Sequence, residues 1–382
     1  MYYLYIKKTF LMLFSVLALF SIINFFVDPE NIYPKLFSSD EPESLLVSYS
    51  NKLMQSKYGI LDEEFNILNE RERKKALALF SKDTDCAIIG SSRIMQISSF
   101  RDEKSLNKHC KSIINLGVPG STLEDYFSFS NILLERKNTI RTIVFGIDHW
   151  SLKFEQDGRY PLLQSDLDKM RFRLKISKNF GASSTVSLVE NFINLQYLNL
   201  SLNKIFSKNK LKEDDEEDKR DEETFNYAKN FNHNNGISGT SVTLPDGSKI
   251  YSSERIDEQK IFNNKKWDGF QNYKVREASD GGWYEERAVD DFTNLVKLLK
   301  GKFNIIFIMT PYHPKVWELD QPAIDLMISI EDKIHLIAKD LNIKVIGSYN
   351  PIKIGCSKNE MFDSMHPKAK CLKKLERKIV EN

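Results

Sequence analysis

The chain has 382 residues, 41% of them hydrophobic, which is enough for one large domain with an insertion or for two domains. Its 55 basic and 53 acidic residues give a formal net charge of only +2. A chain so close to neutrality offers no electrostatic basis for binding a phosphate backbone, so we exclude nucleic acid as a partner.

The first element is an uncharged, apolar run over 10–27, about the length that spans the hydrocarbon core of a membrane. Lys7 and Lys8 precede it and Asp28 follows it, so the positive-inside rule leaves 1–9 as a short cytoplasmic tail. The sequence therefore predicts a single-pass anchor in the cytoplasmic membrane, with the main domain outside the cytoplasm, in a periplasm or on the outer face. A cleavable signal peptide is the alternative, although the bulky end of the run lacks the small residues of a cleavage site.

The main domain is predicted over 81–382, after a polar, helix-compatible stalk or packing segment at 28–80. Short apolar runs here alternate with helical segments, and we expect five of these runs to be strands: 86–90, 112–118, 142–148, 303–310 and 343–348. Such alternation indicates a parallel sheet with helices on both faces. The expected fold class is therefore α/β, a flavodoxin-like three-layer α/β/α domain with a parallel sheet of about five strands, an N-terminal transmembrane helix and a large insertion.

The insertion is expected at about 152–284, where the alternation stops. Within it, the charge run at 211–223 has almost nothing to bury, so we expect a solvated, disordered loop at about 207–235. The stretch SVTLPDGSKIY at 241–251 predicts a hairpin that turns at its Pro-Asp-Gly. An insertion at this place lies over the carboxyl edge of the sheet, where ligands bind in open α/β folds, so it is a candidate for substrate recognition.

The four cysteines form two candidate pairs. Cys86 and Cys110 each precede an apolar run, and Cys356 and Cys371 bracket the stretch NEMFDSMHPK. In an oxidising compartment both pairs would form disulfides, and four unpaired thiols are the alternative. No cysteine or histidine spacing suggests zinc and no glycine block matches a phosphate loop, so we expect neither a metal nor a cofactor.

Two adjacent serines, Ser91 and Ser92, lie directly after the first strand of the main domain. Gly90 precedes them and Arg93 follows them. A serine at such a turn displays its hydroxyl at the sheet edge, and the N–H groups of a following helix would stabilise an oxyanion. Serine is also a preferred helix cap, which would account for one of the two. Arg93 would pair either with an anionic substrate group or with a neighbouring acid.

A nucleophilic serine needs a base, and the base needs an orienting group. The stretch FDSMHPK supplies Asp363 and His366, three residues apart and just before the last amphipathic run. An aspartate at this spacing can fold back to hold the Nδ1 proton of the histidine, leaving Nε2 to face Ser92.

Other strand ends supply candidate oxyanion and substrate-binding residues. The stretch NLGVPGST, which begins at Asn115, puts Gly117 and Gly120 just past the second strand, and a glycine there lets a backbone N–H approach a substrate closely; for Gly120 an ordinary turn is the alternative. Asp148 follows the third strand, where a capping or ion-paired role is the alternative. Tyr312 and His313 follow the fourth, where they would hang over the same edge as Ser92 and contact a sugar, unless this is a structural loop bounded by prolines.

Together these blocks resemble the SGNH, or GDSL-like, hydrolase superfamily: Gly-x-Ser after the first strand, Asn-x-Gly-x-x-Gly after the second, Gly-x-x-x after the third and Asp-x-x-His near the C-terminus. The resemblance covers about 84–150 and 300–382. It implies that Ser92 is the nucleophile, His366 the base and Asp363 its orienting partner, with the N–H groups of Gly120 and Ser92 in the oxyanion hole.

The chain departs from the family pattern in two places. Ser91 stands where the GDS signature has aspartate, and Asp148 stands where the third block has an asparagine that would donate to the oxyanion. An ionised carboxylate cannot donate a hydrogen bond and would repel the developing charge. Either Asp148 points away, or another donor serves, or activity is weak or absent.

A Gly-Ser-Ser block behind an N-terminal anchor is similar to the envelope branches of this superfamily, such as the membrane-anchored protein of teichoic-acid D-alanylation and the proteins of alginate acetylation. The similarity implies a membrane-anchored extracytoplasmic serine esterase or O-acyltransferase that acts on an acyl group of a cell-surface polysaccharide or glycolipid through an acyl-enzyme. Envelope-biosynthesis proteins are further candidate partners. The alternative is a catalytically inactive module of the same fold that binds glycan or a partner in envelope polysaccharide assembly.

Overall fold

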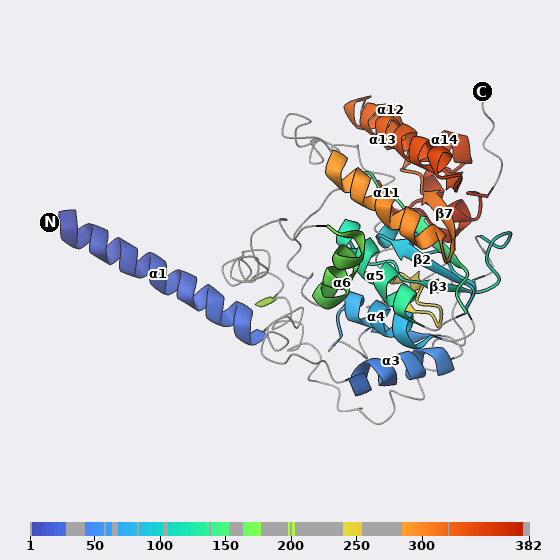
Figure 1. Cartoon of the computed structure of the whole chain (residues 1–382). Helices are drawn as coiled ribbons and strands as arrows, with labels where there is room; N and C mark the ends of the chain where they lie inside the picture. Colours follow the sequence, from blue (N-terminus) through green and yellow to red (C-terminus); the bar gives the residue numbers. More distant parts are fainter. Residues whose placement is uncertain are drawn as a thin grey trace.

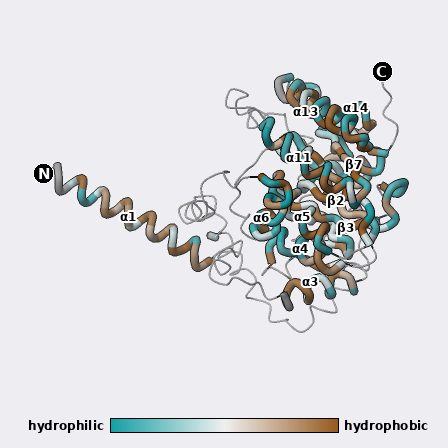
Figure 2. The backbone as a smooth tube through the Cα atoms, viewed as in Figure 1, coloured by the Kyte–Doolittle hydropathy of each residue, from teal (hydrophilic) through white to brown (hydrophobic). Residues whose placement is uncertain are grey.

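The computed structural model describes residues 2–27, 43–56, 59–62, 68–81, 84–101, 106–136, 139–152, 163–176, 198, 201–202, 240–253, 285–319 and 321–376. A long N-terminal helix, α1 (Tyr2–Val27), extends away from the sheet and its helices (Figure 1). Near its C-terminal end the Asn24 Oδ1 accepts the Ser201 hydroxyl at 3.2 Å. Its stretch Tyr5–Val27 is long and apolar enough to cross a membrane, a test that a signal sequence also passes. Figure 2 shows α1 as predominantly hydrophobic, and most of its side chains are exposed to solvent. The apolar run is thus a helix that begins several residues before residue 10.

A five-stranded parallel sheet forms the centre of the body, and all five predicted strands are confirmed. The strands are β2 (Cys86–Gly90), β3 (Ile113–Asn115), β4 (Thr142–Gly146), β7 (Asn304–Met309) and β8 (Lys344–Gly347). Their order across the sheet is β3-β2-β4-β7-β8, and every neighbouring pair is parallel. This is the flavodoxin-like order, in which the chain leaves β2 toward one edge and returns to β4 on the other side. The switch point therefore lies between the carboxyl ends of β2 and β4.

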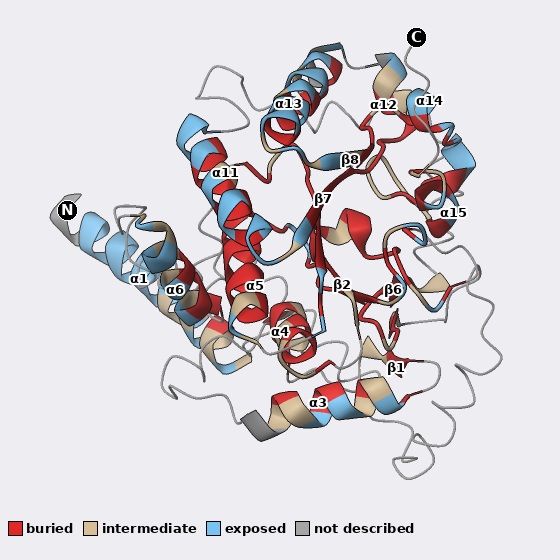
Figure 3. Cartoon of the chain, turned by 45° about the vertical axis from the view of Figure 1, so that its right-hand side comes forward, coloured by how far each residue is buried: buried red, intermediate tan, exposed pale blue. Residues whose placement is uncertain are grey.

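Alternate residues of the strands face two separate cores, as expected of a sheet buried on both faces. Ile89, Phe145 and Phe307 belong to the larger core, whereas Ile88 and Val144 belong to the smaller one. The helices that pack on the larger core are α4 (Glu70–Phe80), α5 (Leu123–Glu135), α11 (Glu286–Lys300) and α13 (Gln321–Asp340). Short elements cover the other face, namely the 3₁₀ turn η2 (Ser92–Ile94), α14 (Pro351–Ile354) and α15 (Ala369–Leu372). Figure 3 shows these two layers on either side of the sheet.

The described part of 28–80 packs onto this body, so of the two predicted roles it has the packing one. Besides α4 it forms α3 (Glu43–Gln55), and Tyr49 and Leu53 of α3 are fully buried in the larger core. Asn69 and Glu72 form a reciprocal capping box that begins α4. The core thus extends N-terminal to the predicted boundary at residue 81.

The predicted hairpin of the insertion is confirmed. It consists of β5 (Val242–Thr243) and β6 (Lys249–Ile250), which form a small antiparallel sheet with β1 (Ile60–Leu61) in the order β1-β5-β6. The hairpin packs beside β3, because the Asn115 N–H donates to the Asp246 carbonyl at 2.7 Å, and the Lys249 N–H donates to the Met95 carbonyl at 2.8 Å. The insertion also contributes α6 (Gln164–Leu174), which packs on α5. The loop predicted at about 207–235 lies outside the described residues.

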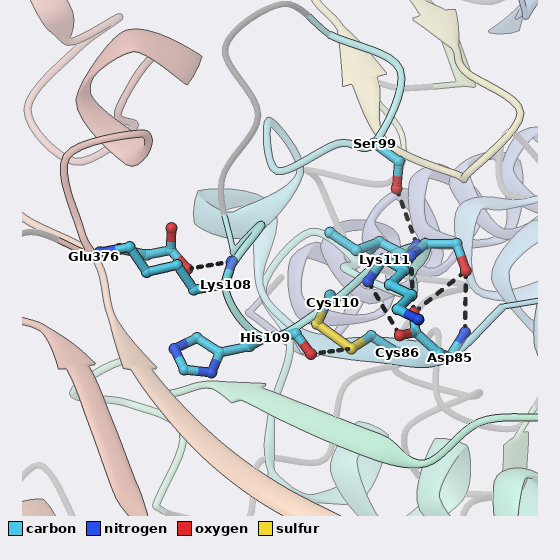
Figure 4. The surroundings of a disulfide bond; sticks show 10 residues. Asp85, Cys86, Ser99, Lys108, His109, Cys110, Lys111 and Glu376 are labelled. Carbon is cyan, nitrogen blue, oxygen red and sulfur yellow. Dashed lines mark hydrogen bonds between the residues drawn. A yellow bond between two sulfur atoms is a disulfide. The ribbon is translucent and has the colours of Figure 1, made fainter.

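Both candidate cysteine pairs are disulfides. Cys86–Cys110 joins the start of β2 to the segment before β3, next to Asp85, whose carboxylate accepts the Ser112 N–H at 2.8 Å (Figure 4). Cys356–Cys371 encloses the segment that contains the predicted Asp-x-x-His block. An N-terminal apolar helix and two disulfides fit a membrane-anchored extracytoplasmic domain.

Gly90 is needed for close packing at the end of β2. It does not adopt a positive φ, but a Cβ built on it would lie 2.7 Å from the carbonyl oxygen of Gly146 in β4. We expect Gly90→Ala to lower the free energy of unfolding by about 1–3 kcal/mol, because β2 and β4 would have to separate. Chemical denaturation measures this loss, with Gly301→Ala as the control because the nearest atom to a Cβ there is 3.4 Å away. Equal stability of the two variants would refute the close approach.

Candidate active site

Ser91 and Ser92 have different environments at the end of β2. Ser91 is fully buried and caps η2, its Oγ accepting the Arg93 N–H at 3.2 Å. Ser92 is the first residue of η2 and is partly exposed. The expected helix after the strand is a single 3₁₀ turn, too short for a helix dipole, so any oxyanion stabilisation here must come from individual N–H groups.

Ser92, His366 and Asp363 are connected in the arrangement expected of a catalytic triad. The Ser92 Oγ lies 2.8 Å from the His366 Nε2. On the other side of the ring, the His366 Nδ1 lies 2.7 Å from the Asp363 Oδ2. With the Nδ1 proton held by the carboxylate, Nε2 is left to accept the hydroxyl proton of Ser92. The structure thus brings together residues that are 274 positions apart in the sequence.

A tight loop fixes the aspartate and histidine relative to each other. The Phe362 N–H donates to the His366 carbonyl at 2.8 Å, and the Asp363 Oδ1 accepts the backbone N–H groups of Met365 at 2.9 Å and His366 at 2.8 Å. Burial alone would raise the pKa of Asp363, but the hydrogen bonds and charge of His366, together with these N–H donors, lower it to about 2. Asp363 is therefore ionised at neutral pH and able to orient His366.

The expected backbone donors lie at the same edge of the sheet. The Val118 N–H donates to the Gly90 carbonyl at 3.0 Å, which brings the loop after β3 beside the turn that carries Ser92. Two residues further on, Gly120 is exposed and has a φ of +59°, a conformation that favours glycine. Within the part of the chain that the structure describes, the N–H groups of Ser92 and Gly120 donate to no protein group. Both remain candidate donors to an oxyanion.

Arg93 and Asp148 form a buried ion pair, so the acid rather than the substrate is the partner of Arg93. The Arg93 Nη1 donates to the Asp148 Oδ1 at 2.7 Å, and both side chains are at most 2% exposed. Burial raises the pKa of Asp148, and the guanidinium opposes that rise. Of the two partners left open for Arg93, the structure has the neighbouring acid, and for Asp148 it has the ion-paired alternative.

Tyr312 and His313 are buried, whereas the sequence predicts that they hang over the sheet edge and contact a sugar. They are 2% and 1% exposed. The Tyr312 hydroxyl lies 2.6 Å from the His149 Nδ1, and the His313 Nδ1 accepts the Lys315 N–H at 3.1 Å. Burial lowers the pKa of His313 to about 4, so it is neutral. The alternative of a structural loop bounded by prolines holds.

Asn115 lies beneath the turn that carries Ser92 and supports it from inside the protein. It is fully buried, and its Nδ2 donates to the carbonyls of Ile94 at 2.8 Å and Ile97 at 2.9 Å. Its Oδ1 accepts the Gly117 N–H at 2.9 Å. Asn115 therefore joins the loop after β3 to the segment after Ser92, and a direct contact with substrate does not fit its burial.

Tyr251, at the end of the insertion hairpin, is a neighbour of the site that sequence reasoning missed. Its hydroxyl donates to the Ser92 carbonyl at 3.3 Å, and its ring packs edge-on against Phe362 at 5.0 Å between centroids. It thus contacts both the nucleophile turn and the loop of Asp363. The hairpin pattern predicted the strands but carried no signal of where they would pack.

No protein-family model matches the chain. No curated protein matches it significantly. Among the residues that the structure describes, no group of three or more His, Cys, Asp or Glu side chains is arranged to hold a metal ion.

Proposed function

We propose that this protein is a membrane-anchored extracytoplasmic serine esterase or O-acyltransferase of the SGNH type. The observation that carries the proposal is the continuous chain of contacts from the Ser92 Oγ through the His366 ring to the Asp363 carboxylate, at 2.8 and 2.7 Å. These three residues, their spacing and the position of Ser92 at the switch point of a parallel sheet match what the family resemblance implies.

In the first half-reaction the Ser92 Oγ attacks the acyl carbonyl carbon, and its proton passes to the His366 Nε2. The ionised Asp363 stabilises the imidazolium that forms. The carbonyl oxygen becomes an oxyanion, for which the N–H groups of Ser92 and Gly120 are the candidate donors. The intermediate collapses when the bond between the acyl carbon and the alcohol oxygen breaks. The leaving alcohol takes the proton from Nε2, and an acyl-Ser92 ester remains.

In the second half-reaction a hydroxyl attacks the acyl carbon, and its proton passes to the His366 Nε2. Collapse breaks the ester bond to Ser92, whose Oγ recovers the proton. Water as the attacking group makes the protein an esterase, and a hydroxyl of a sugar makes it a transferase.

The location of the site supports a cell-surface polysaccharide or glycolipid as the substrate. The apolar helix α1 fits an uncleaved anchor with a cytoplasmic N-terminus, and the two disulfides fit an oxidising compartment beyond that membrane. Acylated polymers and lipids of the envelope are the esters present there. Envelope-biosynthesis proteins are the partners we propose.

A catalytically inactive module that binds glycan, or a partner in polysaccharide assembly, is the second candidate. The observation that favours it is Asp148, which occupies the position of a donor asparagine with a group that accepts a hydrogen bond from Arg93 instead. In that case Ser92→Ala and His366→Ala would leave the cellular phenotype intact, and deletion of the insertion would remove it.

A fluorophosphonate probe tests the proposal on the full-length chain in detergent. We expect one adduct, on Ser92, identified by intact mass and peptide mapping, because only a serine activated by a neighbouring base reacts readily with the probe. Ser92→Ala should abolish the adduct, whereas Ser91→Ala, which removes the cap of η2 and leaves the Ser92 hydroxyl in place, should retain it. Failure of the folded wild-type protein to react would favour the inactive module.

A further inference from the structure

The buried side chain next to the nucleophile binds three separate segments around the site. Each nitrogen of the Arg93 guanidinium has one acceptor: Nη1 donates to the Asp148 Oδ1 at 2.7 Å, Nε donates to the Met365 carbonyl at 2.9 Å, and Nη2 donates to the Thr310 carbonyl. The acceptors come from the segment after β4, the loop of the histidine and the segment after β7. Arg93 is 1% exposed, so none of these bonds is shared with bulk water.

We infer that Arg93 is the positioning residue of this site: it fixes the loop that carries His366 against the turn that carries Ser92, and it binds the Asp148 carboxylate in a buried ion pair. The inference rests on the proposed roles of Ser92 and His366. It assigns Arg93 no contact with substrate.

The hydrogen bond from Arg93 to Met365 links Arg93 to the loop of the proposed base, His366. Met365 directly precedes His366, and its carbonyl is bound by the residue that directly follows Ser92. Arg93 therefore connects the segment that carries Ser92 directly to the segment that carries His366. Catalysis needs the distance between nucleophile and base held within a fraction of an ångström, because a displacement of about 1 Å can cost about 100-fold in rate.

The contact with Asp148 accounts for the aspartate where the family pattern has asparagine. A buried carboxylate without a partner would be costly and would repel an oxyanion nearby. Here its Oδ1 is bound by the guanidinium, whose central carbon also lies 3.8 Å from the centroid of the Tyr312 ring. The aromatic ring supports the cation from one face, so the plane of the guanidinium is fixed. Asp148 thus contributes an anchor for Arg93 in place of a donor for the substrate.

Lysine cannot reproduce this arrangement, because it has a single ammonium nitrogen where arginine has a planar fork of three. We expect Arg93→Lys in the full-length chain to lower the rate of fluorophosphonate modification of Ser92 by about 100-fold. The double variant Arg93→Met/Asp148→Leu leaves no unpaired buried charge and tests the same loss if the lysine variant fails to fold.

The matched control is Arg71→Lys, because Arg71 and Asp125 form a second Arg–Asp pair with both contacts at 2.8 Å and at most 2% side-chain exposure. This pair joins α4 to α5, away from the histidine loop. We expect a similar loss of thermal stability in Arg71→Lys with an unchanged modification rate per folded molecule. A loss of rate in both variants would mean that any damage to a buried pair slows the site, and it would overturn the inference.

A second readout does not depend on acyl chemistry. In protein with ¹⁵N-labelled histidine, the His366 Nδ1 proton held by Asp363 should give a low-field resonance, assigned by its loss in His366→Gln. We expect this resonance to disappear or broaden in Arg93→Lys and to persist in Arg71→Lys. If wild type does not react with the probe but its resonance depends on Arg93, the positioning role stands and the proposed function fails. If wild type reacts and Arg93→Lys retains both rate and resonance, the positioning role is refuted while the proposed function stands.

Discussion

Replacing His366 with glutamine should slow the fluorophosphonate modification of Ser92 by about 10⁴-fold or more, since removal of the base in a serine triad has effects of this size. Glutamine keeps a polar group of similar reach, but it cannot take the proton that lies between the Ser92 Oγ and Nε2 in the wild type. The time course of adduct formation, followed by intact mass on the full-length chain, gives the ratio of rates.

The control for that experiment is His335→Gln, which changes an exposed histidine on α13. We expect it to react at the wild-type rate. If His366→Gln also reacted at that rate, Ser92 would not depend on a base, and the contact of 2.8 Å would have no chemical role.

The aspartate should contribute less than the histidine, because it acts through the ring, which it orients and whose positive charge it stabilises. We expect Asp363→Asn to react more slowly than wild type but faster than His366→Gln. The pKa of Asp363 is about 2 in the folded chain, below its value of about 3.9 in an unfolded one. The ionised carboxylate therefore stabilises the folded state above about pH 4, and this contribution is lost as the pH falls toward 2.

Removing the disulfide Cys356–Cys371 with two serines should lower the free energy of unfolding by about 3 kcal/mol, the size expected for a closed loop of about 15 residues. It should also slow the modification of Ser92 well beyond the loss of folded protein. The disulfide encloses the loop in which Phe362 and His366 exchange a backbone hydrogen bond and in which Asp363 is held. Urea unfolding gives the stability, and the probe gives the rate at a denaturant concentration at which every variant is folded.

The other disulfide is the matched control. Cys86–Cys110 spans 24 residues rather than 15, so its removal should cost slightly more stability on loop length alone. It lies at the amino ends of the strands, opposite the site, so Cys86→Ser/Cys110→Ser should leave the rate of modification per folded molecule unchanged. The prediction for Cys356–Cys371 fails if the two double variants lose the same rate.

Local pattern was sufficient to predict the strands and the hairpin. The runs at 86–90 and 142–148 are short, apolar and rich in β-branched residues. Such runs are typical of buried strands. The contacts among Ser92, His366 and Asp363 could also be predicted, because Asp363 and His366 are close in sequence, and a strand end displays Ser92 wherever a parallel sheet forms.

Partner choice among the buried polar groups could not be predicted in the same way. The sequence favoured neither of two partners for Arg93, an anionic substrate group or a neighbouring acid. The partner is Asp148 because Met365 and Thr310 bind the other nitrogens of the guanidinium in the buried site. Tyr312 follows a strand as Ser92 does, yet it lies under the guanidinium rather than at the surface. Such outcomes depend on side-chain contacts between segments far apart in the chain, which no local pattern contains.

The separation of 274 positions between Ser92 and His366 also sets the order in which the site is assembled. A chain is synthesised from its N-terminus, so β2 and Ser92 are made long before the loop of His366. Until that loop is in place, the Ser92 hydroxyl lacks its contact with the His366 Nε2. Under the proposed function, the serine would therefore become reactive only when the last part of the chain has folded.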